Sequence, residues 1–217
     1  MCLACGGLRF KNVRAGVARV REELEALIGE PVVELTAQSD DGAPATRVVV
    51  GTEAVLQRID RADAVAFLDL DQELLAPRYR AAEQALALVA RAARVAARSG
   101  PATGGRAAGR LLLQTRLPDH EVVQAALHGD PQRVSDAEQE RRALLRFPPC
   151  TAMAEVSGPA APAFVAALGR PLGIEVGEVG EGRWLVRAPD HAALSGALAA
   201  VPRPPGRLRV AVDPLRV

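Results

Sequence analysis

The feature that most constrains the fold is a pair of consecutive prolines, Pro148-Pro149, after a polar segment with helical spacing, residues 119–145. A proline has no backbone N–H to donate, and its ring clashes with the preceding turn, so a helix cannot continue through two prolines. The helical segment must therefore end before this pair. We predict a domain boundary near Pro148, with residues 148–217 forming a C-terminal domain.

Beyond the prolines, strand patterns and helical patterns follow one another in the order β-α-β-β-α-β. The strand patterns are AMAEVSG, GIEVGEVG, GRWLVRAP and RLRVAVDP, and the helical patterns are APAFVAALG and HAALSGALAAV. This order is that of the ferredoxin-like or split βαβ motif. We therefore expect a small α+β domain of this type at the C-terminus.

Residues 16–115 alternate strands and helices in a different way. The segment ARVREELEALIG predicts a helix that ends at Gly29, and the alanine-rich residues 80–98 predict a longer helix. Apolar runs in PVVEL, ATRVVVGTEAV, AVAFLDLD and GRLLLQT predict strands, while the glycine-rich residues 99–109 predict a loop. Such alternation is typical of an α/β layer with a mostly parallel sheet.

Composition and charge exclude several classes of protein. The net charge of +1 gives no overall electrostatic preference for an acidic partner. The sequence has no run of 18 apolar residues for a membrane span and no basic, apolar leader for secretion. The three cysteines, Cys2, Cys5 and Cys150, do not indicate a disulfide framework. We expect a cytoplasmic protein with no membrane partner.

The sequence lacks several common catalytic motifs. It contains no phosphate-binding G-x-x-x-x-G-K-[ST], no G-x-S-x-G and no H-E-x-x-H, so we assign no catalytic residue. His120, His128 and His191 lie in turn-like or helix-start contexts, which favours surface or capping roles. Asp69 and Asp71 follow an apolar strand, where they would hold a metal or nucleotide, or bond nearby loop amides.

Seven segments of the chain match, in order, the motifs of one protein family. They are C-x-x-C-G (2–6), GVARVREEL (16–24), VVVGTEAV (48–55), LDLDQELLAPRYRAAEQ (68–84), GRLLLQTRLPDHEVVQAAL (109–127), RFPPC (146–150) and the closing VAVDPLRV. Together they cover nearly the whole chain. From Gly16 onwards, the chain resembles the C-terminal portion of the primosomal replication-restart proteins, the PriA family, also called primosomal protein N-prime.

The resemblance implies three parts and a function. Residues 1–15 would be the remnant of a zinc-binding insert, residues 16–147 an incomplete second RecA-like helicase lobe, and residues 148–217 a C-terminal DNA-binding domain. The chain would then be a DNA-binding component of replication restart at stalled or abandoned forks. Its partners would be forked or single-stranded DNA and other replication-restart proteins.

The helicase motifs depart from the family pattern. Family motif VI reads Q-V-A-G-R-A-G-R, whereas this chain has RAARVAAR at residues 91–98. Val95 replaces the first motif arginine and offers no guanidinium to a γ-phosphate, so only Arg98 is kept. Gly51 and Thr52 keep the G-T of motif V. We expect degenerate nucleotide-binding residues at Gly51, Thr52 and Arg98, as in the actinobacterial branch of the family, without bound ATP and without helicase activity.

Cys2 and Cys5 would form half of a tetrahedral zinc site, because a structural zinc ion takes four ligands. In the family the insert binds two zinc ions with eight cysteines, and this pair would be the last. We expect the partner cysteines upstream, in a longer protein of which this chain is a C-terminal fragment. The alternative is a short C-x-x-C turn without metal.

Two other functions stay open from the sequence. One is an active ATP-dependent 3'-5' DNA helicase lobe that requires a separate N-terminal chain. The other is a stand-alone redox or zinc module built on Cys2 and Cys5. A redox C-x-x-C normally follows a strand at a helix N-terminus, whereas Gly6-Gly7 follow the pair here.

The first candidate nucleic-acid contact is a row of arginines on the alanine-rich helix. Among the 27 basic residues only Lys11 is a lysine, so any phosphate contact falls mainly to arginine. Arg91, Arg94 and Arg98 are spaced i, i+3 and i+7 and therefore share one helix face. This face would contact phosphates, or it would be solvated or docked on acidic residues.

The second candidate contact is on the C-terminal strands. In GRWLVRAP the two-residue period of a strand puts Arg183 and Arg187 on one face and Trp184 on the other. Arg207 and Arg209 belong to the final strand pattern, which would pair nearby. We assign these four arginines to phosphate contact that does not read base sequence. Trp184 would be either a core residue or a platform for a stacked base.

Overall fold

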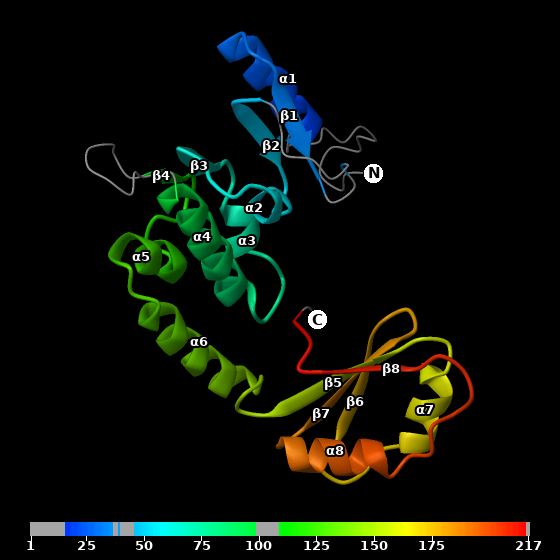
Figure 1. Cartoon of the computed structure of the whole chain (residues 1–217). Helices are drawn as coiled ribbons and strands as arrows, with labels where there is room; N and C mark the ends of the chain where they lie inside the picture. The colour runs from blue at the N-terminus through cyan, green and yellow to red at the C-terminus, as the bar shows by residue number, and fades with distance from the viewer. Residues whose placement is uncertain (1–15, 37–38, 40–45, 99–108, 216–217) are drawn as a thin grey trace, which may run out of the picture. The chain divides into compact units, whose positions relative to one another are not determined.

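The computed structural model describes residues 16–36, 39, 46–98 and 109–215. It is a mixed α/β structure, as the sequence predicted (Figure 1). Its helices are α1 (Val17–Ile28), α2 (Val55–Arg58), α3 (Asp71–Leu74), α4 (Ala81–Ala97), α5 (Glu121–His128), α6 (Gln132–Leu145), α7 (Ala161–Leu168) and α8 (His191–Ala199). Its strands are β1 (Val32–Leu35), β2 (Val48–Gly51), β3 (Ala64–Phe67), β4 (Arg110–Leu113), β5 (Ala152–Ser157), β6 (Glu175–Gly180), β7 (Arg183–Ala188) and β8 (Arg209–Val212).

The chain divides into two compact units, each described here by itself. The first comprises the residues up to Phe67 together with Leu88–Leu112, and the second comprises Leu68–Ala87 and the residues from Leu113 onwards. The domain boundary predicted near Pro148 stays a prediction. Within the second unit, side chains before Pro148 contact residues after it. Examples are Gln84 Nε2 to the carbonyl oxygen of Leu215 (2.8 Å), Arg146 to Glu175 (3.2 Å) and the Arg187 guanidinium over the Phe147 ring (5.3 Å).

In the first unit, α1 packs against a pair of parallel strands, β1 and β2. The register pairs Val32 with Val48 and Leu35 with Gly51. The helix ends at Gly29, whose φ of 68° lies in the left-handed region that favours glycine. The helix and the two strands predicted for this part of the chain are therefore confirmed.

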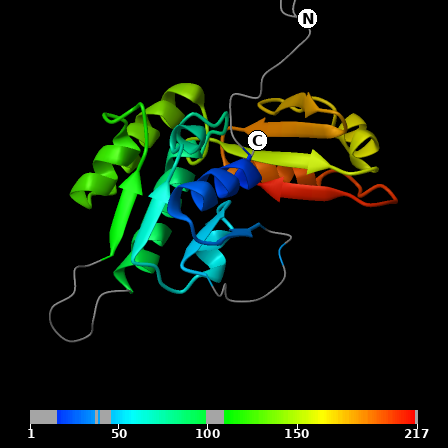
Figure 2. The ribbon, with the colours of Figure 1, turned by 90° about the horizontal axis from the view of Figure 1, so that it is seen from above.

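A second pair of strands, β3 and β4, completes the first unit, and the two arrows point the same way in Figure 2. The connection before β3 bonds to α4 and β4. The Ala62 N–H donates to the carbonyl of Val95 (3.2 Å), and the carbonyl of Asp63 accepts from the Arg110 N–H (2.9 Å). Among the described residues, the strands of residues 16–115 form two separate pairs, β1–β2 and β3–β4, where the sequence predicted one sheet.

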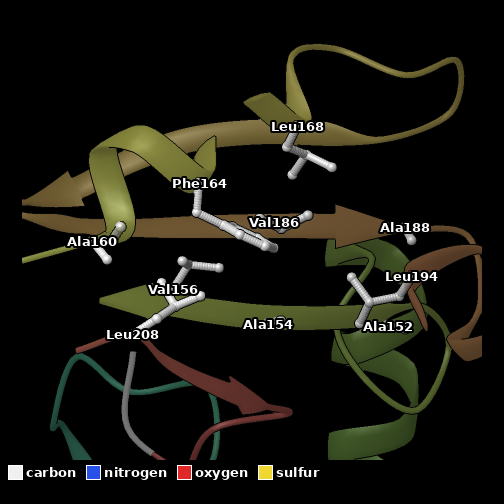
Figure 3. Packing of buried hydrophobic residues seen from close by; sticks show 11 residues of the cluster. Ala152, Ala154, Val156, Ala160, Phe164, Leu168, Val186, Ala188, Leu194 and Leu208 are labelled. Atoms are coloured by element: carbon white, nitrogen blue, oxygen red, sulfur yellow. The ribbon is translucent and has the colours of Figure 1, made fainter. Parts of the chain in front are cut away.

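The second unit contains an antiparallel four-stranded sheet in the order β6-β7-β5-β8. Its elements follow one another as β5-α7-β6-β7-α8-β8, which is the order that the sequence predicted. Side chains from α7 and α8 pack on one face of the sheet (Figure 3). The buried core is made of small and aliphatic side chains around one aromatic ring: Ala152, Ala154, Val156, Ala160, Ala161, Phe164, Leu168, Val186, Ala188, Leu194 and Leu208.

A buried cluster of charged side chains holds α6 within the second unit. The Arg142 side chain is 7% exposed, and its Nη2 lies 2.7 Å from Glu138 Oε2 and 3.0 Å from Glu83 Oε2. The guanidinium also lies over the Tyr79 ring at 5.5 Å, and that ring stacks on Phe147. Glu138 is itself only 8% exposed and also bonds Arg141, so the buried charges compensate one another within this cluster.

Candidate nucleic-acid interface

The predicted zinc ligands Cys2 and Cys5 lie outside the described residues. A closed structural zinc site takes four ligands, whereas the chain has three cysteines, of which Cys150 is exposed. Within the described ranges, no group of three or more His, Cys, Asp or Glu side chains could hold a metal ion. The cysteines of this chain do not complete the four-cysteine site that the family resemblance implies, and zinc binding stays a prediction.

Packing alone requires a glycine at position 51. An alanine Cβ at this position would lie 1.8 Å from the carbonyl oxygen of Leu35 and 2.6 Å from Val55 Cγ2. Thr52 is exposed at the turn into α2, and Arg98 is exposed just after α4. No hydrogen bond among the described residues joins Arg98 to either motif V residue. The nucleotide roles of Gly51, Thr52 and Arg98 stay predictions.

Gly51→Ala is expected to lower the free energy of unfolding by about 1–3 kcal/mol, because β1 and β2 must separate to admit the methyl group. Gly16→Ala is the matched control in the same unit. Gly16 has a φ of −63°, and a Cβ added there meets no atom within 4 Å. The measurement is urea unfolding followed by circular dichroism. Equal midpoints for the two variants would show that the close approach to Leu35 is not what requires glycine.

The arginines of the motif VI segment lie on the solvent side of α4. Arg91, Arg94 and Arg98 are all exposed, as their spacing predicted. On the opposite side of the same helix Ala92 and Val95 are buried, and Val95 is only 5% exposed. Position 95 is therefore a core position of the first unit. Valine packs there, whereas an arginine would have to bury its guanidinium.

Strand β7 divides its side chains between the two faces of the sheet in the alternation that the sequence predicted. Trp184 and Val186 face α7 and α8 and pack in or against the core. Arg183, Leu185 and Arg187 lie on the opposite face, which we call the outer face. Trp184 is partly buried and packs against the core, which favours the first of its two predicted roles, a core residue, over a stacking platform.

Register places two of the predicted arginines on either side of one serine. Ser157 of β5 pairs with Arg183 of β7 and with Arg209 of β8, and paired residues point to the same face. The two arginine Cα atoms are thus two strand spacings apart, roughly 10 Å. We call Arg183, Ser157 and Arg209 the arginine row. Both arginines are exposed, at one end of the outer face.

A buried carboxylate adjoins the arginine row. Glu155, two residues before Ser157 on β5, points to the same face and is nearly buried. It accepts a hydrogen bond from Arg183 Nη2. This hydrogen bond and the negative charge of Glu155 raise the pKa of the Arg183 guanidinium. The charge of Arg183 is therefore partly neutralised by Glu155.

The other two predicted arginines differ in their surroundings. Arg187 lies opposite Glu175 in the register, and its guanidinium is over the Phe147 ring, 5.3 Å from the centroid. It is half-buried and already engaged. Arg207 precedes β8 and is exposed. The structure thus brings Arg183 and Arg209 together across β5, keeps Arg207 at the β8 edge, and gives Arg187 a structural contact.

Glu155 and Ser157 were not identified from the sequence, although a signal for them exists. In AMAEVS the alternate residues Ala152, Ala154 and Val156 are apolar, so the period of two assigns Glu155 and Ser157 to the other face. The alternation does not show which strands lie beside β5. Only the register shows that these side chains lie beside arginines.

Two predicted structural roles are supported by contacts outside the sheet. Asp71 accepts hydrogen bonds from the Thr115 hydroxyl and from the Arg116 N–H (3.1 Å), and the bond from Thr115 lowers the pKa of Asp71. This supports the prediction that Asp71 bonds loop amides. His120 is the N-cap of α5 and accepts from the Val122 N–H (3.2 Å), as a capping residue does.

No model of a known protein family matches the chain. In the part of the chain that the structure describes, every helix is too short or too polar to cross a membrane. The case for a function therefore rests on the motifs of the sequence and on the placement of the charged side chains.

Proposed function

We propose that this chain is a DNA-binding component of replication restart, similar to the C-terminal part of the PriA family. The observation that carries the proposal is the common order of the seven family-like segments, from C-x-x-C-G to VAVDPLRV. Its ligand would be forked or single-stranded DNA, and its protein partners would be other replication-restart proteins.

The finer fold assignments belong to the same proposal. The strand order β6-β7-β5-β8, with α7 and α8 on one face, supports a ferredoxin-like domain at the C-terminus. The parallel pair β1–β2, with α1 packed on it, supports an incomplete RecA-like lobe. In this assignment the DNA contact is on the C-terminal sheet, and the lobe acts as a scaffold without nucleotide turnover.

The arginine row is the best-placed phosphate contact. Arg183 and Arg209 are exposed on the same face, and the Ser157 hydroxyl between them is a further possible donor. Arginine binds phosphate oxygens through paired N–H groups, which supply affinity without reading the bases. A row without an exposed aromatic platform is therefore suited to a backbone contact. We expect modest affinity that falls as salt rises.

We expect no ATP hydrolysis by this chain, with or without DNA. The sequence has no phosphate-binding loop, and the position of the first motif VI arginine is the buried Val95. Loss of an arginine finger alone costs roughly 10³-fold or more in rate. The measurement is phosphate release in the presence of magnesium, ATP and forked DNA. Hydrolysis that Arg98→Ala abolishes would instead support the helicase-lobe alternative.

The proposal is tested by titrating labelled DNA with the whole chain at low salt. Forked, single-stranded and fully paired DNA of equal length are compared by fluorescence anisotropy. We expect saturable binding of forked or single-stranded DNA, tighter than that of the paired DNA. An absence of binding to all three at low salt would reject a DNA-binding function for this chain.

A further inference from the structure

The edge of the C-terminal sheet at β8 has an apolar strip that α7 and α8 do not cover. Among the described strands β8 pairs only with β5, so its other side is unpaired. Val210 and Val212 point to the same face as the core residues Val156 and Ala154, with which they pair. Yet Val210 is 40% exposed and Val212 54% exposed. A strand edge of this kind has free backbone groups beside an open apolar surface.

An open hollow lies beside this edge. Its lining consists of five apolar residues and three arginines: Phe164, Leu198, Val201, Leu208, Val210, Arg203, Arg207 and Arg209. Arg203 is held in place because its Nη2 donates to the carbonyl of Leu208 (2.9 Å). The described lining includes no acidic side chain. The hollow measures about 590 Å³, which is room for several side chains of an incoming segment.

The alternation of β8 defines what an added strand must contain. Its residues opposite Val210 and Val212 would lie over the apolar hollow, where β-branched side chains pair well. Its intervening residues would point to the outer face beside Arg209, where a carboxylate is the favourable cross-strand partner. We propose that β8 binds an extended segment of a partner protein in which acidic and β-branched residues alternate. This proposal goes beyond DNA binding: it uses the unpaired edge of β8 and shares only Arg209 with the arginine row.

Two other occupants fit these residues less well. A nucleic acid held by the arginines through its phosphates would leave the apolar strip of Val210 and Val212 uncovered, and no base could stack on the aromatic residue of the described lining, Phe164, which is only 4% exposed. A second copy could pair its own β8 with this edge, but the Arg209 side chains of both copies would then lie on the same outer face and repel each other. The other edge of this sheet, β6, has an irregular register between Glu178 and Gly180, and such a bulge hinders strand addition.

The test is binding of a labelled synthetic peptide in which eight residues of glutamate and valine alternate. The controls are a lysine–valine peptide of the same pattern and a peptide of identical composition with the glutamates and valines in two blocks. We expect saturable binding of the alternating acidic peptide by the whole chain, and slower amide hydrogen exchange in β8 when it is bound. Binding of the lysine peptide or the block peptide with equal affinity would overturn the proposal.

A matched pair of variants locates the site. Val212→Asp should weaken peptide binding about fivefold or more, since it places a charge in the apolar strip. Val179→Asp changes an equally exposed valine, 45% exposed, on the β6 edge and should leave binding unchanged. Equal effects of the two variants would overturn the proposal. It would also be overturned if the chain bound no peptide and Val212→Asp, but not Val179→Asp, abolished self-association or DNA binding. Because none of these readouts depends on DNA binding at the arginine row, failure here leaves the DNA-binding function standing.

Discussion

Replacing Arg142 by alanine is expected to lower the free energy of unfolding by about 3 kcal/mol, because the buried Glu138 carboxylate then keeps only the more exposed Arg141 as its ionic partner. Arg142 bonds Glu138 through both Nε (3.0 Å) and Nη2 (2.7 Å), and its Nη2 also contacts Glu83 (3.0 Å). The same guanidinium lies over Tyr79. Its removal therefore affects α4, α6 and the connection before α4 at once. The measurement is urea unfolding of the whole chain.

Two control variants distinguish the effect of burial on stability from the effect of the ion pair itself. Arg19→Ala removes an Arg–Glu pair of the same i, i+4 spacing, but on the exposed face of α1, and should hardly change stability. Arg142→Met combined with Glu138→Leu removes both buried charges and should recover most of the loss, since apolar replacement of a buried pair is often neutral. A cost below about 1 kcal/mol for Arg142→Ala would show that Glu138 finds water or another partner.

The second large effect is expected on DNA binding. Arg183→Ala combined with Arg209→Ala should weaken binding roughly tenfold or more at low salt, because two phosphate contacts are lost. Glu155→Gln should act in the opposite direction and strengthen binding about fivefold, since it removes a negative charge beside Arg183 and leaves a neutral amide of the same shape. The measurement is the dissociation constant for single-stranded DNA at one low salt concentration.

The sign of the Glu155→Gln effect distinguishes two roles for this carboxylate. If Glu155 only lowers the positive charge of the row, the variant binds more tightly. Weaker binding by a variant that keeps its thermal stability would mean that Glu155 positions the Arg183 guanidinium. Arg187→Ala should change affinity little, because Arg187 already lies over Phe147. A large effect of Arg187→Ala would move the phosphate contact toward the middle of the sheet.

Local patterns predicted the elements and the faces of the C-terminal sheet well. The period of two in GRWLVRAP was enough to place Trp184 and Arg183 on opposite faces of the sheet, because this depends on a single strand. The pairing of β5 with β7 and β8 could not be predicted in this way. That β5 lies between β7 and β8, and therefore that Arg183 and Arg209 flank Ser157, follows from pairing between strands distant in sequence.

The same reasoning failed where packing depends on more than one element. Leu27 and Ile28 have the helical spacing of a buried face, yet both are exposed at the end of α1. The alternation of strands and helices in residues 16–115 indicated one sheet, whereas the described residues form two pairs of strands. Periodicity reports which side of an element is apolar, but it does not report whether a neighbour covers that side.

The central claim is that the arginine row contacts a nucleic-acid backbone, and the salt dependence of binding tests it most directly. The logarithm of the association constant for single-stranded DNA is measured against the logarithm of salt concentration for the wild type, for Arg183→Ala with Arg209→Ala, and for Arg91, Arg94 and Arg98 all changed to alanine. We predict that the sheet variant flattens the slope by roughly 1.4, as expected for two lost phosphates, while the helix variant leaves it unchanged. An unchanged slope for the sheet variant together with a flatter slope for the helix variant would contradict the account and assign the contact to α4.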